Sequence, residues 1–193
     1  MISPFHPGKF LRHLYLVMAL AYLSAPAKAD TEDWWLPENM LVQSLGYQGA
    51  ISLGGSYEIT DWYALDLLYG YSSSAISGHT VQLLTVKNRF FWTGGYLESD
   101  LASRVYLGIG FINGLNSGLF YRLPDRYPRG YYAPTALRSS LHLGWEGRLS
   151  QKWSTYGELV YLDSEWAPAL VHSQSMNFRE FGSFALGLSM SLP

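Results

Sequence analysis

Residues 183–192 read SFALGLSMSL, and the side chains in this stretch alternate between two kinds. Large apolar residues stand at every second position, and only Ser, Ala and Gly stand between them; the apolar set is Phe184, Leu186, Leu188, Met190 and Leu192. Successive side chains of a β-strand point to opposite faces of its sheet. The stretch therefore predicts a strand with one wholly apolar face and one face of small residues.

The same period of two recurs upstream. It is clear in residues 51–59, 65–71, 105–111 and 138–149, weaker in 79–91 and 154–163, and extends to 40–47. These segments predict an all-β protein with eight strands. Both faces of segments 79–91 and 154–163 mix residue types, and a β-bulge there would reverse the phase. The face that each of these two strands presents therefore stays open.

Short and long connections alternate between the predicted strands. The shorter ones are residues 60–62, 93–99 and 150–153, and the longer ones are 72–78, 112–135 and 166–180. An even strand number with short turns at one end and long loops at the other is typical of bacterial outer-membrane barrels. We therefore expect an eight-stranded antiparallel up-and-down transmembrane β-barrel over residues 40–193.

The alternation does not say which face points inward. A secreted lipocalin-like ligand-binding barrel, with its apolar face around a ligand, has the same period. Lipid outside is favoured by the small residues of the polar face and by Trp62, Trp92 and Trp153, which fall at or beside the three shorter connections. Tryptophans gather at membrane interfaces.

Residues 1–29 have the parts of a secretory signal peptide. Lys9, Arg12 and His13 precede a ten-residue apolar run, residues 14–23, and small residues lead to Ala29. This run is too short to span a bilayer. We expect cleavage near Ala29, followed by a periplasmic N-terminal lead over residues 30–39.

The composition excludes several classes of protein. Of the 193 residues, 48% are hydrophobic and 16% aromatic, which is incompatible with intrinsic disorder. The 13 basic and 15 acidic residues make no electrostatic case for binding nucleic acid. Cysteine is absent, so disulfides and thiol catalysis are excluded. His79, His142 and His172 are not spaced as ligands of a common metal, and we expect neither a metal nor a cofactor.

With its signal peptide, dyad repeat, loop asymmetry and C-terminal strand, the chain resembles the small eight-stranded outer-membrane proteins of Gram-negative bacteria. The resemblance implies an outer-membrane protein with a structural or surface-interaction role, a monomer whose partners are lipopolysaccharide and the outer-membrane assembly machinery. The chain departs from the family at its end, because such strands usually finish with an aromatic residue and this one finishes with Leu192 and Pro193.

If the apolar face meets lipid, the charged residues of the strands point into the lumen. This set comprises Glu58, Asp66, Lys87, Arg89, Arg104, Arg138, Glu146, Arg148 and Glu158, and His142 lies on the same face. Desolvated charges must pair, and the near balance of signs fits that requirement. The residues form either a polar pathway or a salt-bridge plug, and the narrow interior of an eight-stranded barrel favours the plug.

Two long loops carry further candidates. Residues 112–135 contain arginines and tyrosines, which can bind phosphate and stack on sugar; they are Tyr121, Arg122, Arg126, Tyr127, Arg129 and Tyr131. They indicate a site in an external loop that binds lipopolysaccharide. The alternative is a loop that folds on itself.

Residues 166–180 contain His172, Ser175 and Glu180, the residue types of nucleophilic hydrolysis. They resemble, in part, those of the PagL-like lipid A deacylases. That family carries a His-x-Ser-Asn motif, and this chain has Gln174 at the position of the motif's serine. The resemblance implies an ester hydrolase, and the alternative is an ordinary polar loop. Loss of one acyl chain from lipid A, measured by mass spectrometry of expressing cells, would distinguish the two.

Overall fold

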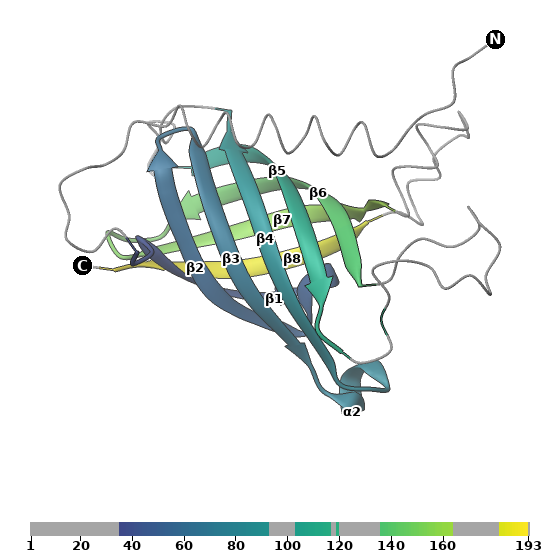
Figure 1. The fold of residues 1–193 in the computed structure, drawn as a ribbon. Coiled ribbons are helices and arrows are strands. Elements are labelled where there is room, and N and C mark those ends of the chain that lie inside the picture. The colour runs from purple at the N-terminus through teal and green to yellow at the C-terminus, as the bar shows by residue number, and fades with distance from the viewer. Residues whose placement is uncertain (1–34, 93–102, 117–118, 120–135, 164–181, 193) are drawn as a thin grey trace, which may run out of the picture. The chain divides into compact units, whose positions relative to one another are not determined.

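Eight strands close into a barrel in the computed structural model, which describes residues 35–92, 103–116, 119, 136–163 and 182–192. The strands are β1 (Asn39–Leu45), β2 (Ile51–Thr60), β3 (Tyr63–Ser72), β4 (Val81–Phe91), β5 (Ser103–Gly114), β6 (Leu137–Arg148), β7 (Trp153–Leu162) and β8 (Ser183–Ser191). Each pairs antiparallel with its sequence neighbours, and β1 pairs with β8 (Figure 1). The predicted eight-stranded antiparallel up-and-down barrel is confirmed.

The two ends of the barrel differ. At one end, here called the turn end, β2 meets β3 and β6 meets β7 through short turns, and Asn39 of β1 lies opposite Ser191 of β8. At the other, the loop end, β1 meets β2 through the 3-10 helix η1 (Gly46–Gln48), and β3 meets β4 through α2 (Ser74–Ser77). No helix in the described part of the chain is long and apolar enough to cross a bilayer.

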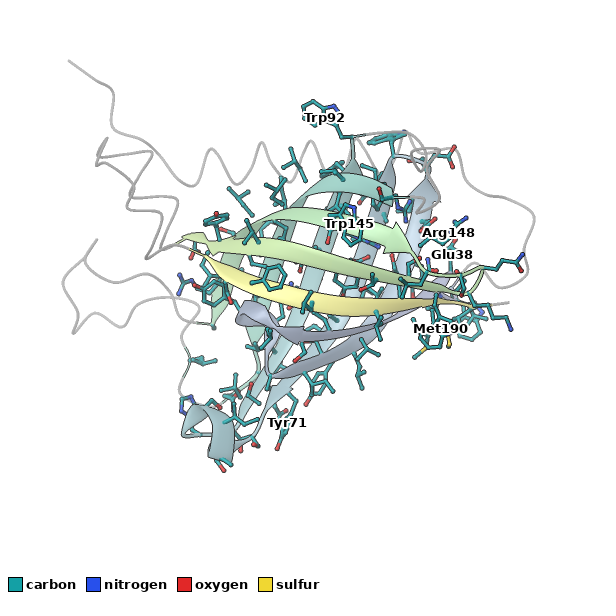
Figure 2. The ribbon with its side chains drawn as sticks, turned by 180° about the vertical axis from the view of Figure 1, so that it is seen from behind. Glu38, Tyr71, Trp92, Trp145, Arg148 and Met190 are labelled. Atoms are coloured by element: carbon teal, nitrogen blue, oxygen red, sulfur yellow. The ribbon has the colours of Figure 1, made fainter. Side chains whose placement is uncertain are left out.

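The outer wall is apolar. In β8, Phe184, Leu186 and Leu188 are exposed, whereas Ala185 between them is buried. Leu107 of β5, Leu143 of β6 and Leu159 of β7 pair directly across the strands and form an exposed row. Figure 2 shows side chains projecting from the wall, with Met190 at the turn end and Tyr71 at the loop end. The apolar face of each strand thus points away from the lumen.

Aromatic side chains gather at the turn end of this wall. Trp62, Trp92 and Trp153 are all exposed there, as their positions at the shorter connections predict. The ring of Trp62 stacks on Phe90 with 6.4 Å between centroids, and Phe90 stacks on Tyr63 at 5.2 Å. This end of the wall therefore carries a band of aromatic rings, and its exposed tryptophans are suited to an interface between water and an apolar phase.

The structure settles the phase of the two ambiguous strands. Lys87 and Arg89 of β4 and Glu158 of β7 are buried inside the barrel. The pattern of β4 is mixed because Asn88 belongs to its outer face. There Asn88 lies buried beside Tyr63, whose hydroxyl donates a hydrogen bond of 2.8 Å to its side-chain oxygen. A shift of register does occur between β2 and β3, at Glu58 and Thr60, but it lies outside the two ambiguous strands β4 and β7.

Two tyrosines interlock with glycines inside the barrel. Tyr106 of β5 faces the lumen directly opposite Gly144 of β6, and Tyr156 of β7 lies opposite Gly187 of β8. A Cβ added to either glycine would overlap the facing ring. Glycine is needed here because the aromatic ring occupies the space that any larger side chain would fill.

Replacing Gly144 with valine is therefore expected to reduce the free energy of unfolding by about 1–3 kcal/mol, the usual cost of overpacking an interior. Urea titration of the refolded protein measures this loss. Gly157→Val is the matched control, because a Cβ there would meet the nearest ring atom of Phe184 at an ordinary 3.5 Å. Equal losses in the two variants would contradict the interlock.

The connection between β1 and β2 turns into the barrel. Leu45, Gly46 and Gly49 have φ of 67°, 75° and 111°, and left-handed backbone of this kind redirects a chain sharply. The resulting helix η1 comes close to β3, β4, β7 and β8. Of these, β4 and β8 lie on opposite sides of the eight-stranded barrel. Gln48 is fully buried. The connection thus lies across the lumen at the loop end.

Candidate functional site

Arg89 is the centre of a charged cluster in the lumen. Its guanidinium approaches Asp66 of β3 (Nε to Oδ2, 2.9 Å) and Glu146 of β6 (Nη1 to Oε2, 2.7 Å), and it donates to Ser56 Oγ of β2 at 2.8 Å. Asp66 pairs directly with Lys87 across the strands, so Arg89, two positions on, is its diagonal neighbour. Glu146 comes from β6, which is separated from β4 by β5 alone.

The cluster extends both ways from Arg89. Toward the turn end, Arg104 Nη2 lies 3.0 Å from Glu146 Oε1 and 2.7 Å from Glu58 Oε1. Toward β7, Lys87 Nζ lies 3.4 Å from Asp66 and 3.1 Å from Glu158. Ion pairs thus link Glu58 to Glu158 in one continuous series, here called the lumen network.

Aromatic rings flank the cations of the lumen network. The guanidinium carbon of Arg104 lies 3.8 Å from the centroid of the Phe91 ring, and that of Arg89 lies 5.3 Å from the Tyr106 ring. Lys87 Nζ lies 5.2 Å from the centroid of Tyr156. The Tyr106 hydroxyl also donates a hydrogen bond of 2.8 Å to Glu158 Oε2. These rings attract the cations and exclude water from them.

The structure places the charges expected in the lumen at three depths. Six are buried: Asp66, Lys87, Arg89, Arg104, Glu146 and Glu158. Glu58 and Arg138 are half-buried near the turn end and the loop end respectively. Arg148 differs from the expectation that it lies within the lumen, because it is the last residue of β6 and stands exposed at the turn-end rim.

The sequence pattern does not predict Asp163 as a partner of the charged residues in the barrel. It follows the last residue of β7, out of phase with the inward row, yet it reaches back to β6. Its carboxylate accepts hydrogen bonds from Arg138 Nε at 2.6 Å and from the backbone N–H of Ser139 at 3.2 Å. Alternation stops at a strand's end, so no local pattern marks such a partner.

His142 is buried between Ser140 and Glu158. Its Nε2 lies 2.8 Å from Ser140 Oγ, and its Nδ1 lies 3.4 Å from Glu158 Oε1. Serine, histidine and acid in this order are the parts of a nucleophilic triad. Ser140 is, however, fully buried, and a Cβ on Gly110 of the neighbouring strand would lie 2.5 Å from its hydroxyl. The Ser140 hydroxyl is thus enclosed in the packed wall of the barrel, where its partner is His142 Nε2.

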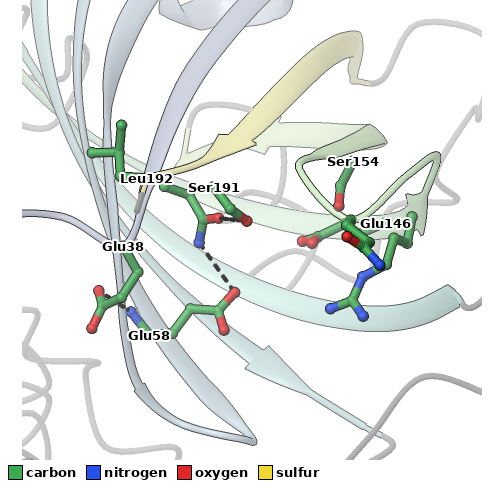
Figure 3. A pocket seen from close by; sticks show the side chains of 9 residues that line it. Glu38, Glu58, Glu146, Ser154, Ser191 and Leu192 are labelled. Atoms are coloured by element: carbon green, nitrogen blue, oxygen red, sulfur yellow. Dashed lines mark hydrogen bonds between the residues drawn. The ribbon is translucent and has the colours of Figure 1, made fainter.

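A cavity of about 200 Å³ opens at the turn end below the lumen network. Glu38, Glu58, Glu146 and Arg148 line it together with uncharged residues. Figure 3 labels the three glutamates among the side chains that surround it. Hydrogen bonds join its walls: Asn39 donates to Glu58 at 3.3 Å and accepts from Ser191 Oγ at 2.9 Å. The cavity therefore reaches Glu146, where the pair with Arg104 begins the buried part of the network.

The remaining candidates lie outside the described residues. These are the signal peptide, the external-loop set Tyr121, Arg122, Arg126, Tyr127, Arg129 and Tyr131, and the hydrolase set His172, Ser175 and Glu180. All of them stay predictions. In the described part of the chain, no three acidic or histidine side chains are grouped as metal ligands.

No protein-family model matches the chain, and no curated protein is significantly similar to it. Two solved structures resemble it. A chain described as "De novo design of transmembrane beta-barrels" is 13% identical with a TM-score of 0.47, over 81% of this chain and 97% of that one. The N-terminal β-barrel domain of OprF from Pseudomonas aeruginosa is 13% identical with a TM-score of 0.44, over 81% and 98%.

Proposed function

We propose that this chain is an integral outer-membrane β-barrel with a closed lumen, and that it serves a structural or surface-interaction role rather than transport. The observation that carries the proposal is the polarity of the closed barrel. Its outer wall is a continuous apolar surface, and its charges are paired inside. Bacterial outer-membrane barrels combine an apolar outer band, aromatic girdles and a polar interior in this way.

The same polarity argues against a secreted ligand-binding barrel. Such a barrel needs its apolar rows on the inside, around the ligand. Here Leu143 and Leu188, in the middle of their strands, are 47% and 45% exposed on the outer wall. In water this wall would be an apolar patch far larger than soluble monomers carry. Lipid is the environment that removes this penalty.

Closure of the lumen is supported at two levels. Eight strands leave an interior just wide enough for side chains. The lumen network fills the middle with buried, paired charges, and a hydrogen bond of 2.7 Å between Gln43 and Gln48 holds η1 across the loop end. Opening a pore would separate ion pairs whose members are desolvated, which is costly.

Fractionation and conductance test the proposal together. The processed chain is expected in the outer-membrane fraction, extractable only with detergent, and the purified protein is expected to give no steady ion current in a planar lipid bilayer. Recovery in the soluble fraction without detergent would refute membrane insertion. A stable current proportional to voltage would refute closure of the lumen while leaving insertion intact.

A further inference from the structure

An open groove of about 670 Å³ lies at the loop end, over η1. Eleven described residues from β1, the β1–β2 connection, β3, α2, β4 and β8 line it, among them Leu45, Tyr47, Ile76, Val81, Leu83 and Phe184. None of these lining residues is charged, in contrast to the cavity at the turn end, where Glu38, Glu58, Glu146 and Arg148 take part. The described lining of the groove thus differs from that of the turn-end cavity in carrying no charge.

The groove connects the outer wall with the mouth of the lumen. Phe184 is 48% exposed and belongs to the outer wall, since it pairs with the outward-facing Leu159. Val81 and Leu83 of β4 are in phase with the buried Thr85 and Lys87, so they face inward. One groove lined by both kinds of residue crosses the rim of the barrel.

The inward turn after β1 explains the groove. The backbone at Leu45 has φ of 67°, a conformation that non-glycine residues rarely adopt, and Leu45 remains 55% exposed. From this point the chain forms a floor across the lumen instead of continuing the wall. Ile76 of α2, 71% exposed, adds another apolar side chain.

We propose that this groove binds one acyl chain of a membrane lipid, which crosses the rim beside Phe184 and lies over η1. The inference rests on the proposed function, because the source of the acyl chain is the lipid that surrounds the barrel. Continuity with the lipid-facing wall and an uncharged lining favour an acyl chain over a headgroup, since burying a charged headgroup without partners is unfavourable. The acyl chain covers the apolar lining of the open groove, and removal of that lining from water drives the binding.

Site-directed labelling tests the groove directly, because the chain has no cysteine of its own. A bimane fluorophore is attached to Leu83→Cys in the groove, to Leu143→Cys on the outer wall and to Lys152→Cys in the exposed β6–β7 turn. Each full-length protein is reconstituted into phosphatidylcholine vesicles with and without brominated acyl chains, which quench on contact. We expect strong quenching at positions 83 and 143 and little at 152.

Two further variants sharpen the result. Val81→Cys provides a second label in the groove if Leu83→Cys folds poorly. Phe184→Glu places a charge at the rim and is expected to weaken quenching at position 83 while leaving that at 143 unchanged. An unquenched label at 83 beside a quenched label at 143 would overturn the inference, whether water or another segment of the chain fills the groove. Absence of quenching at 143 would instead overturn membrane insertion itself.

Discussion

Glu146→Leu is expected to lower the free energy of unfolding by about 3–5 kcal/mol, the usual cost of removing one partner from a buried ion pair. Glu146 joins the two arginines of the lumen network, at 2.7 Å from Arg89 and 3.0 Å from Arg104, and it is 3% exposed. Without it, each of these two buried arginines loses one carboxylate partner: Arg89 keeps its ion pair with Asp66, and Arg104 keeps its ion pair with the half-exposed Glu58. Leucine supplies no compensating hydrogen bond.

Reversible urea unfolding in lipid vesicles measures this loss. Glu58→Leu is the matched control, because Glu58 contacts the same Arg104 at 2.7 Å but its side chain is 35% exposed, so we expect a change of only about 0–1 kcal/mol. Glu146→Gln keeps the shape and removes the charge, and should fall between leucine and the native residue. An unchanged unfolding midpoint in Glu146→Leu would show that the lumen network does not stabilise the barrel.

Leu143→Arg tests the outer wall. Leu143 lies in the middle of β6, directly between Leu107 and Leu159 of the neighbouring strands. An arginine facing lipid near the middle of the bilayer costs about 2–4 kcal/mol in a membrane barrel. We expect a loss of this size in the free energy of unfolding from lipid vesicles.

The depth dependence of this cost provides the control. Leu149 stands just beyond the turn end of β6 and is also exposed, so Leu149→Arg is expected to cost only about 0–1 kcal/mol, as at a membrane interface. On a water-facing wall, both substitutions would change stability by no more than about 0.5 kcal/mol. Equal, small effects at positions 143 and 149 would therefore contradict the lipid-facing assignment.

Local patterns predicted the strands because alternation is a property of the backbone itself. The predicted start of the first strand, residue 40, differs by one from Asn39, and the last strand, predicted from residue 183, begins at Ser183. The pattern was ambiguous in β4 because the outward-facing Asn88 is polar yet buried, and its side-chain oxygen accepts a hydrogen bond from the Tyr63 hydroxyl of the neighbouring strand β3. The alternation of polar and apolar residues does not distinguish a polar side chain that is buried on the outer face from one that faces the lumen.

The sequence by itself determined that alternating segments form strands, that one face of each is apolar, and that short and long connections occupy opposite ends. These are consequences of a period of two and of turn chemistry within a few residues. Only the closed barrel decided which charges pair: Lys87 and Glu158 are 71 positions apart, and Asp163 reaches Arg138 from beyond its strand. It also decided that η1 turns into the lumen, because such contacts depend on the register of the whole ring and on the space within it.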